Sequence, residues 1–186
     1  MKKGDHRSGE IEILKEDLIF KNKYVEIFND KVIFPSGTEG TYVRISSESN
    51  ISVGVLPITE EGKMVLIKTF RHAVRGWGYE IPKGEALPQE NYEVAAKREL
   101  EEETGLIPER LIYIGEFCES PAICSGKIKC YVAINCRYSG AVNTEDTEAI
   151  SGSVELTAQE YLNCTDAEFT DAITQLAVYK YITGDT

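Results

Sequence analysis

The sequence predicts an α/β protein with a mixed sheet, whose strands come before and after a central helix in the sequence. A small N-terminal antiparallel β-sheet is expected to precede this domain. The helix is predicted from Asn91 onward, because strong helix formers dominate the stretch and Gly105 stands where a left-handed C-terminal cap is expected. β-like runs occur on both sides of this helix in the sequence. Such an order is typical of an α/β/α layered domain.

The first 48 residues are expected to form a tail and a separate group of strands. Residues 1–9 are polar and predict a disordered tail. Within residues 10–48, three β-like runs are separated by turn-prone residues, at 11–20, 24–33 and 41–45. So few strands cannot bury their own apolar face, and they should therefore pack on the main domain or on another subunit.

The main domain is expected at residues 49–186. Its predicted strands are 51–58, 64–70, 111–117 and 128–135. Residues 71–78 read as a loop that leads into the central helix region.

The C-terminal part is expected to hold one long loop and two helices. Residues 139–153 are rich in turn formers and predict a surface loop that carries Glu145, Asp146 and Glu148. A capping box at Thr157 to Glu160 predicts a short helix. Thr170 is expected to cap a longer one that ends near Gly184.

Composition restricts the class of protein. The chain has 186 residues, of which 42% are hydrophobic and 27% charged, as in ordinary globular proteins. A net charge of −11 disfavours nucleic acid and anionic membranes as partners. No apolar run reaches membrane-spanning length and no signal-peptide core follows the first residues, so a cytoplasmic location is expected. Five cysteines without a CxxC pair indicate neither disulfides nor a zinc site, and the six-residue spacing of the first four has no assigned role.

Three carboxylates share one face of the central helix. At 3.6 residues per turn, Glu99, Glu102 and Glu103 fall within an arc of about 100°. Like charges at these spacings destabilise a helix by a few tenths of a kcal/mol per pair. A hard divalent cation such as Mg²⁺ would offset this repulsion. A solvated acidic helix face is the alternative interpretation.

The residues around this acidic face stand at fixed offsets. Gly84 is followed at set distances by Glu90 and by the run Arg98-Glu99-Leu100-x-Glu102-Glu103-x-Gly105-Leu106. These positions, within residues 84–106, resemble the Nudix box, the signature of hydrolases that act on nucleoside diphosphates linked to another moiety. The resemblance implies the Nudix α/β/α sandwich and a metal-dependent hydrolysis of a pyrophosphate linkage.

The resemblance also implies roles for the acidic residues. Glu99 and Glu103 correspond to metal ligands, Lys83 would add its backbone carbonyl, and Glu102 would be a further ligand or a supporting group. One to three Mg²⁺ or Mn²⁺ ions would bind, and the same three glutamates are the candidate catalytic residues.

Three further positions are expected to support the motif. Gly84 indicates a close backbone approach that a side chain would block. Arg98 and Glu90 resemble the pair that holds the preceding loop against the helix, and would therefore orient the metal ligands.

Residues outside the box resemble the ADP-ribose pyrophosphatases within this family. The matching stretches include Phe70-Arg71-His72, residues 77–82, Pro121 and residues 168–174. The resemblance covers roughly residues 10–182. It implies Mg²⁺-dependent release of AMP and ribose 5-phosphate, by a homodimer whose N-terminal strands reach across to the partner and help to bind the adenosine part.

Three residues are candidate contacts for a nucleotide-sugar substrate. Arg71 would contact phosphate or the terminal ribose, since guanidinium binds phosphate bidentately. Glu80 lies in the matching stretch before the box, and Arg44 lies on one of the N-terminal strands.

Two departures from that subfamily leave the base and the substrate open. Residues 121–127 lack the glutamate that the subfamily often carries there. Either Glu119, Glu145 or Glu148 takes over, or Glu103 suffices, or activity and substrate preference differ. Lys83 stands where ADP-ribose hydrolases commonly have alanine, which would favour another substrate. The alternatives are therefore a hydrolase of another nucleoside diphosphate derivative, and a non-catalytic binder or sensor of ADP-ribose or NAD metabolites.

Overall fold

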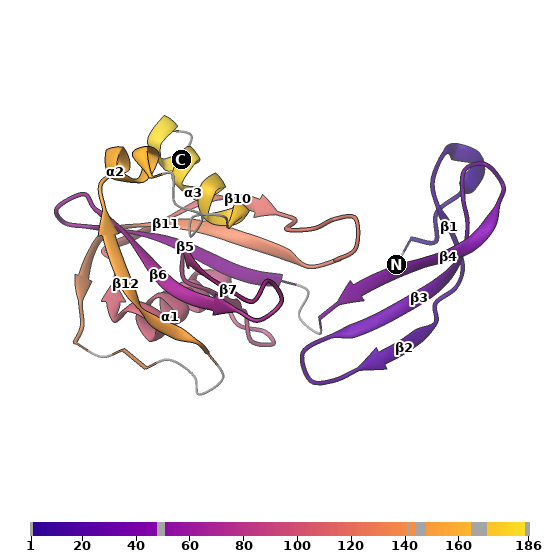
Figure 1. Cartoon of the computed structure of the whole chain (residues 1–186), viewed down its shortest axis with the longest axis horizontal. Coiled ribbons are helices and arrows are strands. Elements are labelled where there is room, and N and C mark those ends of the chain that lie inside the picture. The colour runs from indigo at the N-terminus through magenta and orange to yellow at the C-terminus, as the bar shows by residue number, and fades with distance from the viewer. Residues whose placement is uncertain (1, 48–50, 141, 144–147, 165–170, 185–186) are drawn as a thin grey trace. The chain divides into compact units, whose positions relative to one another are not determined.

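The computed structural model describes most of the chain, namely residues 2–47, 51–140, 142–143, 148–164 and 171–184. The chain separates into two compact units (Figure 1). The first unit contains Met1–Asn50 and Cys118–Lys127, and the second contains Ile51–Phe117 and Ile128–Thr186. Among the described residues, no helix is long and apolar enough to cross a membrane.

The first unit is a four-stranded antiparallel sheet. Its strands are β1 (Glu12–Lys15), β2 (Leu18–Lys21), β3 (Glu26–Ile33) and β4 (Glu39–Ser46). Strand β3 pairs with the other three, so the expected single run at residues 11–20 is two short strands that share one partner. In place of the expected disordered tail, His6–Ser8 form a 3₁₀ helix with Asp5 as its N-cap.

The segment Cys118–Lys127 extends one edge of this sheet. The Ile45 N–H donates to the Ile123 carbonyl at 2.8 Å, and the Ser125 N–H donates to the Ile45 carbonyl at 2.9 Å. Ile45 and Cys124 therefore form a parallel bridge. The loop after Pro121 is thus held by backbone hydrogen bonds to β4.

Among its described residues, the second unit contains eight strands and three helices. The strands are β5 (Ile51–Thr59), β6 (Met64–Arg71), β7 (Gly76–Glu80), β8 (Lys83–Glu85), β9 (Leu106–Ile107), β10 (Arg110–Phe117), β11 (Lys127–Tyr138) and β12 (Ile150–Leu156). The helices are α1 (Tyr92–Thr104), α2 (Ala158–Asn163) and α3 (Ala172–Thr183). The sheet order is β10-β11-β5-β6-β12, with β7 paired to β6, β8 to β5 and β9 to β11.

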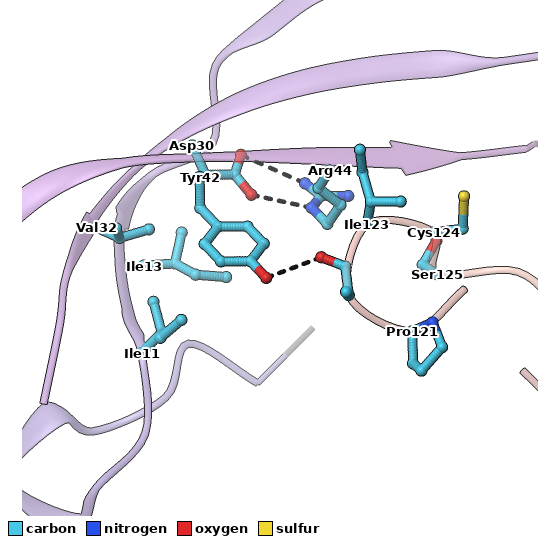
Figure 2. A pocket seen from close by; sticks show the side chains of 11 residues that line it. Ile11, Ile13, Asp30, Val32, Tyr42, Arg44, Pro121, Ile123, Cys124 and Ser125 are labelled. Atoms are coloured by element: carbon cyan, nitrogen blue, oxygen red, sulfur yellow. Dashed lines mark hydrogen bonds and ion pairs between the residues drawn. The ribbon is translucent and has the colours of Figure 1, made fainter.

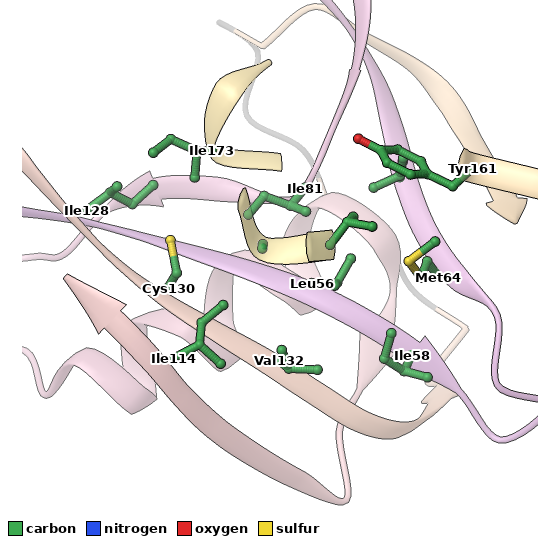
Figure 3. Packing of buried hydrophobic residues seen from close by; sticks show 13 residues of the cluster. Leu56, Ile58, Met64, Ile81, Ile114, Ile128, Cys130, Val132, Tyr161 and Ile173 are labelled. Atoms are coloured by element: carbon green, nitrogen blue, oxygen red, sulfur yellow. The ribbon is translucent and has the colours of Figure 1, made fainter. Parts of the chain in front are cut away.

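The main sheet is buried on both faces, and the side-chain alternation of β5 shows why. Val53 and Val55 belong to the apolar cluster that includes residues of α1. Leu56 and Ile58 belong to the other cluster, which includes residues of α2 and α3 (Figure 3). Successive side chains of a strand point to opposite faces, so a continuous apolar run is what a strand between two layers requires. The expected α/β class, with a small N-terminal antiparallel sheet before a mixed main sheet, is confirmed.

Element boundaries differ from the sequence-based expectation in two places. β7 begins at Gly76 and pairs with β6, so the expected loop at 71–78 closes a hairpin. β12 begins at Ile150, inside the expected 139–153 loop, because it pairs with β6. The capping box at Thr157 and Glu160 is confirmed. Asp171 is the N-cap of α3, and the expected cap Thr170 lies outside the described residues.

Candidate active site

Helix α1 carries two buried carboxylates on adjacent turns. The Asn91 side chain accepts N–H groups of the first turn, and Gly105 ends the helix with φ 69°. These caps fix the helix ends, as the left-handed glycine in the sequence indicated. Glu99 and Glu103 are each 6% exposed and face the strand β8 side of the unit.

Strand β8 approaches these carboxylates with its backbone. A Cβ atom at Gly84 would lie 2.2 Å from the carboxylate carbon of Glu99, so any other residue here would displace that carboxylate. The Lys83 N–H donates to Oε2 of Glu103 at 3.1 Å. The close backbone approach expected at Gly84 is therefore present, and the backbone of Lys83 adjoins the acidic group.

A third carboxylate joins the two from α1. This carboxylate belongs to Glu148, which precedes β12. One carboxylate oxygen from each of Glu99, Glu103 and Glu148 lies within 4.8 Å of the other two. Burial, together with the charges of Glu148 and Glu99, raises the pKa of Glu103 to about 8. Burial also raises the pKa of Glu99, against the effect of Arg98. Clustered carboxylates in this arrangement match the oxygen ligands that Mg²⁺ or Mn²⁺ takes.

Arg98 holds the loop before α1 to the helix. Its Nη1 donates to Glu99 at 2.6 Å and to Glu102 at 3.0 Å, while its Nη2 donates to Glu90 at 3.0 Å and to the Glu85 carbonyl at 3.1 Å. Arg98 and Glu90 thus form the expected pair. Glu102, expected as a further ligand or a supporting group, accepts a hydrogen bond from Arg98 and lies outside the three-carboxylate group found among the described residues.

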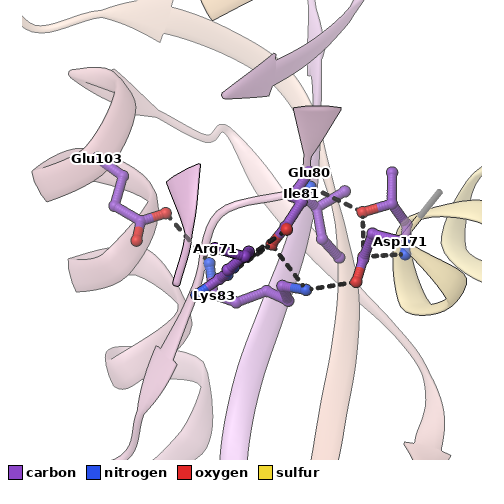
Figure 4. Close-up of polar contacts among 7 residues, drawn as sticks. Arg71, Glu80, Ile81, Lys83, Glu103 and Asp171 are labelled. Carbon is purple, nitrogen blue, oxygen red and sulfur yellow. Dashed lines mark hydrogen bonds and ion pairs between the residues drawn. The ribbon is translucent and has the colours of Figure 1, made fainter. Parts of the chain in front are cut away.

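A network of alternating charges lies next to the cluster (Figure 4). The Arg71 Nε donates to both Glu80 oxygens at 3.0 Å. The Lys83 ammonium lies 3.1 Å from Glu80 and 2.9 Å from Asp171. Asp171 also accepts the Thr174 N–H at 2.8 Å. Two of the three expected substrate contacts, Arg71 and Glu80, therefore belong to a single network.

The cluster and the network share one cavity of about 310 Å³. This volume is within the range of small-molecule sites. Its lining residues are Thr69, Phe70, Arg71, His72, Lys83, Glu103, Glu148, Ala149 and Ile150. The cavity thus presents both carboxylates for cations and basic side chains for an anion.

Arg44, the third expected substrate contact, lies in the first unit (Figure 2). Its Nε donates to Asp30 at 2.9 Å, its Nη2 donates to Glu16 at 3.1 Å, and its guanidinium lies 4.0 Å from the Phe28 ring centre. It lines a separate cavity of about 250 Å³ in that unit. Two carboxylates therefore already compensate its charge.

The structure distinguishes among the expected replacements for the missing loop glutamate. Glu148 lies in the carboxylate cluster, whereas Glu119 is an exposed residue of the first unit. Glu145 lies outside the described residues. Sequence reasoning missed Asp171 as a site residue. The sequence signal at Asp171 is only that of a helix N-cap, where aspartate is favoured, and it does not indicate the contact with Lys83.

The fold and the site define an α/β protein with a buried carboxylate centre suited to divalent cations. The chain belongs to the Nudix family: the model of the NUDIX domain matches residues 48–175. The expectation drawn from the box is thereby confirmed.

Relatives and solved structures agree with this membership. The chain is 28% identical over 173 residues to an ADP-ribose pyrophosphatase of Bacillus subtilis, covering 92% of both chains. It is 32% identical over 149 residues to a methanol dehydrogenase activator of Bacillus methanolicus, covering 80% of both. A crystal structure of an ADP compounds hydrolase superposes with a TM-score of 0.80 at 20% identity, over 94% of this chain and 95% of the other, and shows the same fold.

Proposed function

We propose that this protein hydrolyses the pyrophosphate bond of ADP-ribose, or of a related nucleoside diphosphate sugar, in a reaction that requires Mg²⁺ or Mn²⁺. The products are a nucleoside monophosphate and a sugar phosphate. The observation that carries the proposal is the cluster of Glu99, Glu103 and Glu148, which borders a cavity that Arg71 also lines.

Two of the three carboxylates are held in place by neighbouring groups, and the third comes from a different element. Glu103 is oriented by the Lys83 N–H and Glu99 by Arg98, so both are set to hold a cation together with the Lys83 carbonyl. The metal, when bound, neutralises phosphate oxygens and lowers the pKa of a bound water. Glu148 reaches the cluster from the segment before β12 and is the candidate base.

The chemistry follows from these positions. Water attacks one phosphorus of the diphosphate, the bridging P–O bond breaks, and the water proton passes to the carboxylate of Glu148. Arg71, which is half exposed, binds a phosphate oxygen of the substrate. Arg44 remains a weaker candidate contact, because Asp30 and Glu16 already compensate its charge.

Incubation with ADP-ribose, GDP-mannose, UDP-glucose, NADH and diadenosine polyphosphates, each with and without Mg²⁺, tests the proposal. We expect metal-dependent conversion of ADP-ribose to AMP and ribose 5-phosphate, detected by chromatography. Absence of metal-dependent turnover of all these compounds would contradict it. Calorimetric binding of ADP-ribose that is then recovered intact would instead favour the sensor.

We also propose a homodimer formed through the first unit. In β2, Leu18, Ile19 and Phe20 are 49%, 59% and 49% exposed, so both faces of this strand present apolar side chains. Exposed apolar surface of this kind marks an interaction site. Light scattering should give a dimer for the wild type and a shift toward monomer for Ile19→Lys. A wild-type monomer with full activity would contradict the dimer.

A further inference from the structure

Helix α3 contacts the segment that leads into β8 at two points. Thr174 Oγ1 accepts the N–H of Ile81 at 3.0 Å. Two residues further on, the Lys83 ammonium lies 2.9 Å from Asp171, the N-cap of the same helix. Ile81 is fully buried and the Lys83 side chain is only 10% exposed, so both contacts are shielded from solvent.

This segment, which contains Ile81 and Lys83, also adjoins the carboxylate cluster. The backbone N–H of Lys83 donates to Glu103, and Gly84 packs against the carboxylate of Glu99. A displacement of Lys83 would therefore move the group that orients Glu103. The side chain of Lys83 points to Asp171 while its backbone faces Glu103, so this residue joins α3 to the cluster (Figure 4).

We propose that Asp171 is a positioning residue for the metal ligands, and that it acts through Lys83. The inference rests on the proposed function of the carboxylate cluster as a cation site. Asp171 holds the Lys83 ammonium on the side of the network away from Glu103, and thereby fixes the Lys83 backbone in register with that carboxylate. Without Asp171, the ammonium keeps only Glu80 as a described ionic partner and is free to turn toward the cluster.

The variant Asp171→Asn tests this role, because asparagine caps helices as well as aspartate but carries no charge for Lys83. We expect the dissociation constant for Mn²⁺, measured by electron paramagnetic resonance without substrate, to rise about tenfold. The Mg²⁺ concentration for half-maximal turnover should rise in parallel. The melting temperature should fall, because Lys83 loses an ionic partner, so binding and turnover are measured well below it. Glu60→Gln is the matched control, since Glu60 forms an exposed ion pair with Arg137, and it should change none of these values.

A double variant separates positioning from a general effect of charge. In a Lys83→Met background, Asp171→Asn should weaken Mn²⁺ binding no further, because the partner through which it acts is gone. An equal weakening in both backgrounds would overturn the inference, as would unchanged Mn²⁺ binding in the single variant. If Asp171→Asn fails to fold, Asp171→Ser, which also caps, is measured instead.

The outcomes for this inference and for the proposed function are distinct. A wild type that binds Mn²⁺, is weakened by Asp171→Asn and yet hydrolyses none of the nucleotides would support the positioning role and contradict the hydrolase. A wild type that hydrolyses ADP-ribose with unchanged Mn²⁺ binding in the variant would do the reverse. A wild type that binds no Mn²⁺ would overturn both.

Discussion

Two groups of charged side chains meet at one cavity, which is lined by Arg71 and Lys83 of the first group and by Glu103 and Glu148 of the second. The groups differ in how their charges are arranged. In the first, Arg71, Glu80, Lys83 and Asp171 alternate in sign, and each ion pair is 3.1 Å or shorter. In the second, the carboxylates of Glu99, Glu103 and Glu148 gather within 4.8 Å. We call the first group balanced, because it holds two cations and two anions, and the second unbalanced, because it holds three anions, of which Glu99 pairs with Arg98.

The pKa values of two buried acids express this difference. Burial acts to raise the pKa of Asp171, but Lys83 and Thr174 outweigh it and hold that pKa below its ordinary value. Burial likewise raises the pKa of Glu103, where Glu148 and Glu99 add to the effect and bring it to about 8. Burial acts in the same direction on both acids, but the net shifts of pKa are opposite because the neighbouring charges differ in sign.

The largest effect is expected from removing a charge of the unbalanced group. Glu103→Gln is nearly isosteric and should keep the fold, but should lower kcat by about 10³-fold, which corresponds to ~4 kcal/mol of barrier. Steady-state rates with ADP-ribose and saturating Mg²⁺ measure this. Glu101→Gln, an exposed position on the same helix, is the control and should be near wild type. Unchanged turnover in Glu103→Gln would contradict the metal role.

In the balanced group, a change from glutamate to glutamine should lower the stability of the fold. Glu80 is 5% exposed and is shared by Arg71 and Lys83, so Glu80→Gln leaves two cations with less compensation. We expect a loss of ~3 kcal/mol in the free energy of unfolding, since breaking a buried ion pair from one side is costly. Urea denaturation in EDTA measures it. A loss no larger than that of Glu60→Gln would show that the network is not balanced as described.

The pH dependence of stability should reveal the unbalanced group directly. The pKa of Glu103 rises from about 4.5 when unfolded to about 8 when folded. Its contribution to stability is therefore present below pH 4.5 and is lost as the pH rises through 8. In EDTA, the wild type should lose a few kcal/mol of stability relative to Glu103→Gln between pH 5 and 8.5. Parallel pH profiles of the two proteins would contradict this, and added Mg²⁺ should restore the wild type.

A smaller effect is expected at Arg98, which contacts four groups around the cluster. Arg98→Lys keeps the charge but loses the planar fork that binds Glu90 and Glu99 together. Turnover should fall about tenfold, through misplacement of Glu99. Arg137→Lys, at an exposed ion pair, is the matched control. Equal rates for both variants would show that Arg98 serves only as a surface partner.

Local signals in the sequence predicted the helices, most of the long strands and one side of the site, but not where β7 and β12 begin. Gly105 and the glutamates of α1 follow from helix periodicity and capping, and both lie where expected. The contact of Lys83 with Asp171 spans 88 residues, and the position of Glu148 depends on the pairing of β12 with β6. Neither leaves a periodic pattern, so neither could be derived from spacing.

The cysteine spacing illustrates the same limit. Cys130 and Cys136 stand six apart on β11, and the period of two would place them on one face. They lie in opposite apolar clusters instead. Asn135 has φ 53°, a left-handed conformation that interrupts the alternation between them. Cys130 and Cys136 therefore do not share a face of the strand, and all five cysteines are free thiols.

Calorimetric titration of Mn²⁺ into the metal-free protein at pH 7 is the most direct test of the unbalanced cluster as a cation site. With a pKa of about 8, Glu103 holds a proton at this pH that a bound cation must displace. We predict binding with proton release in the wild type, seen as heats that depend on the ionisation enthalpy of the buffer, and neither feature in Glu103→Gln. Absence of binding to the wild type, or identical binding and proton release in Glu103→Gln, would contradict the account.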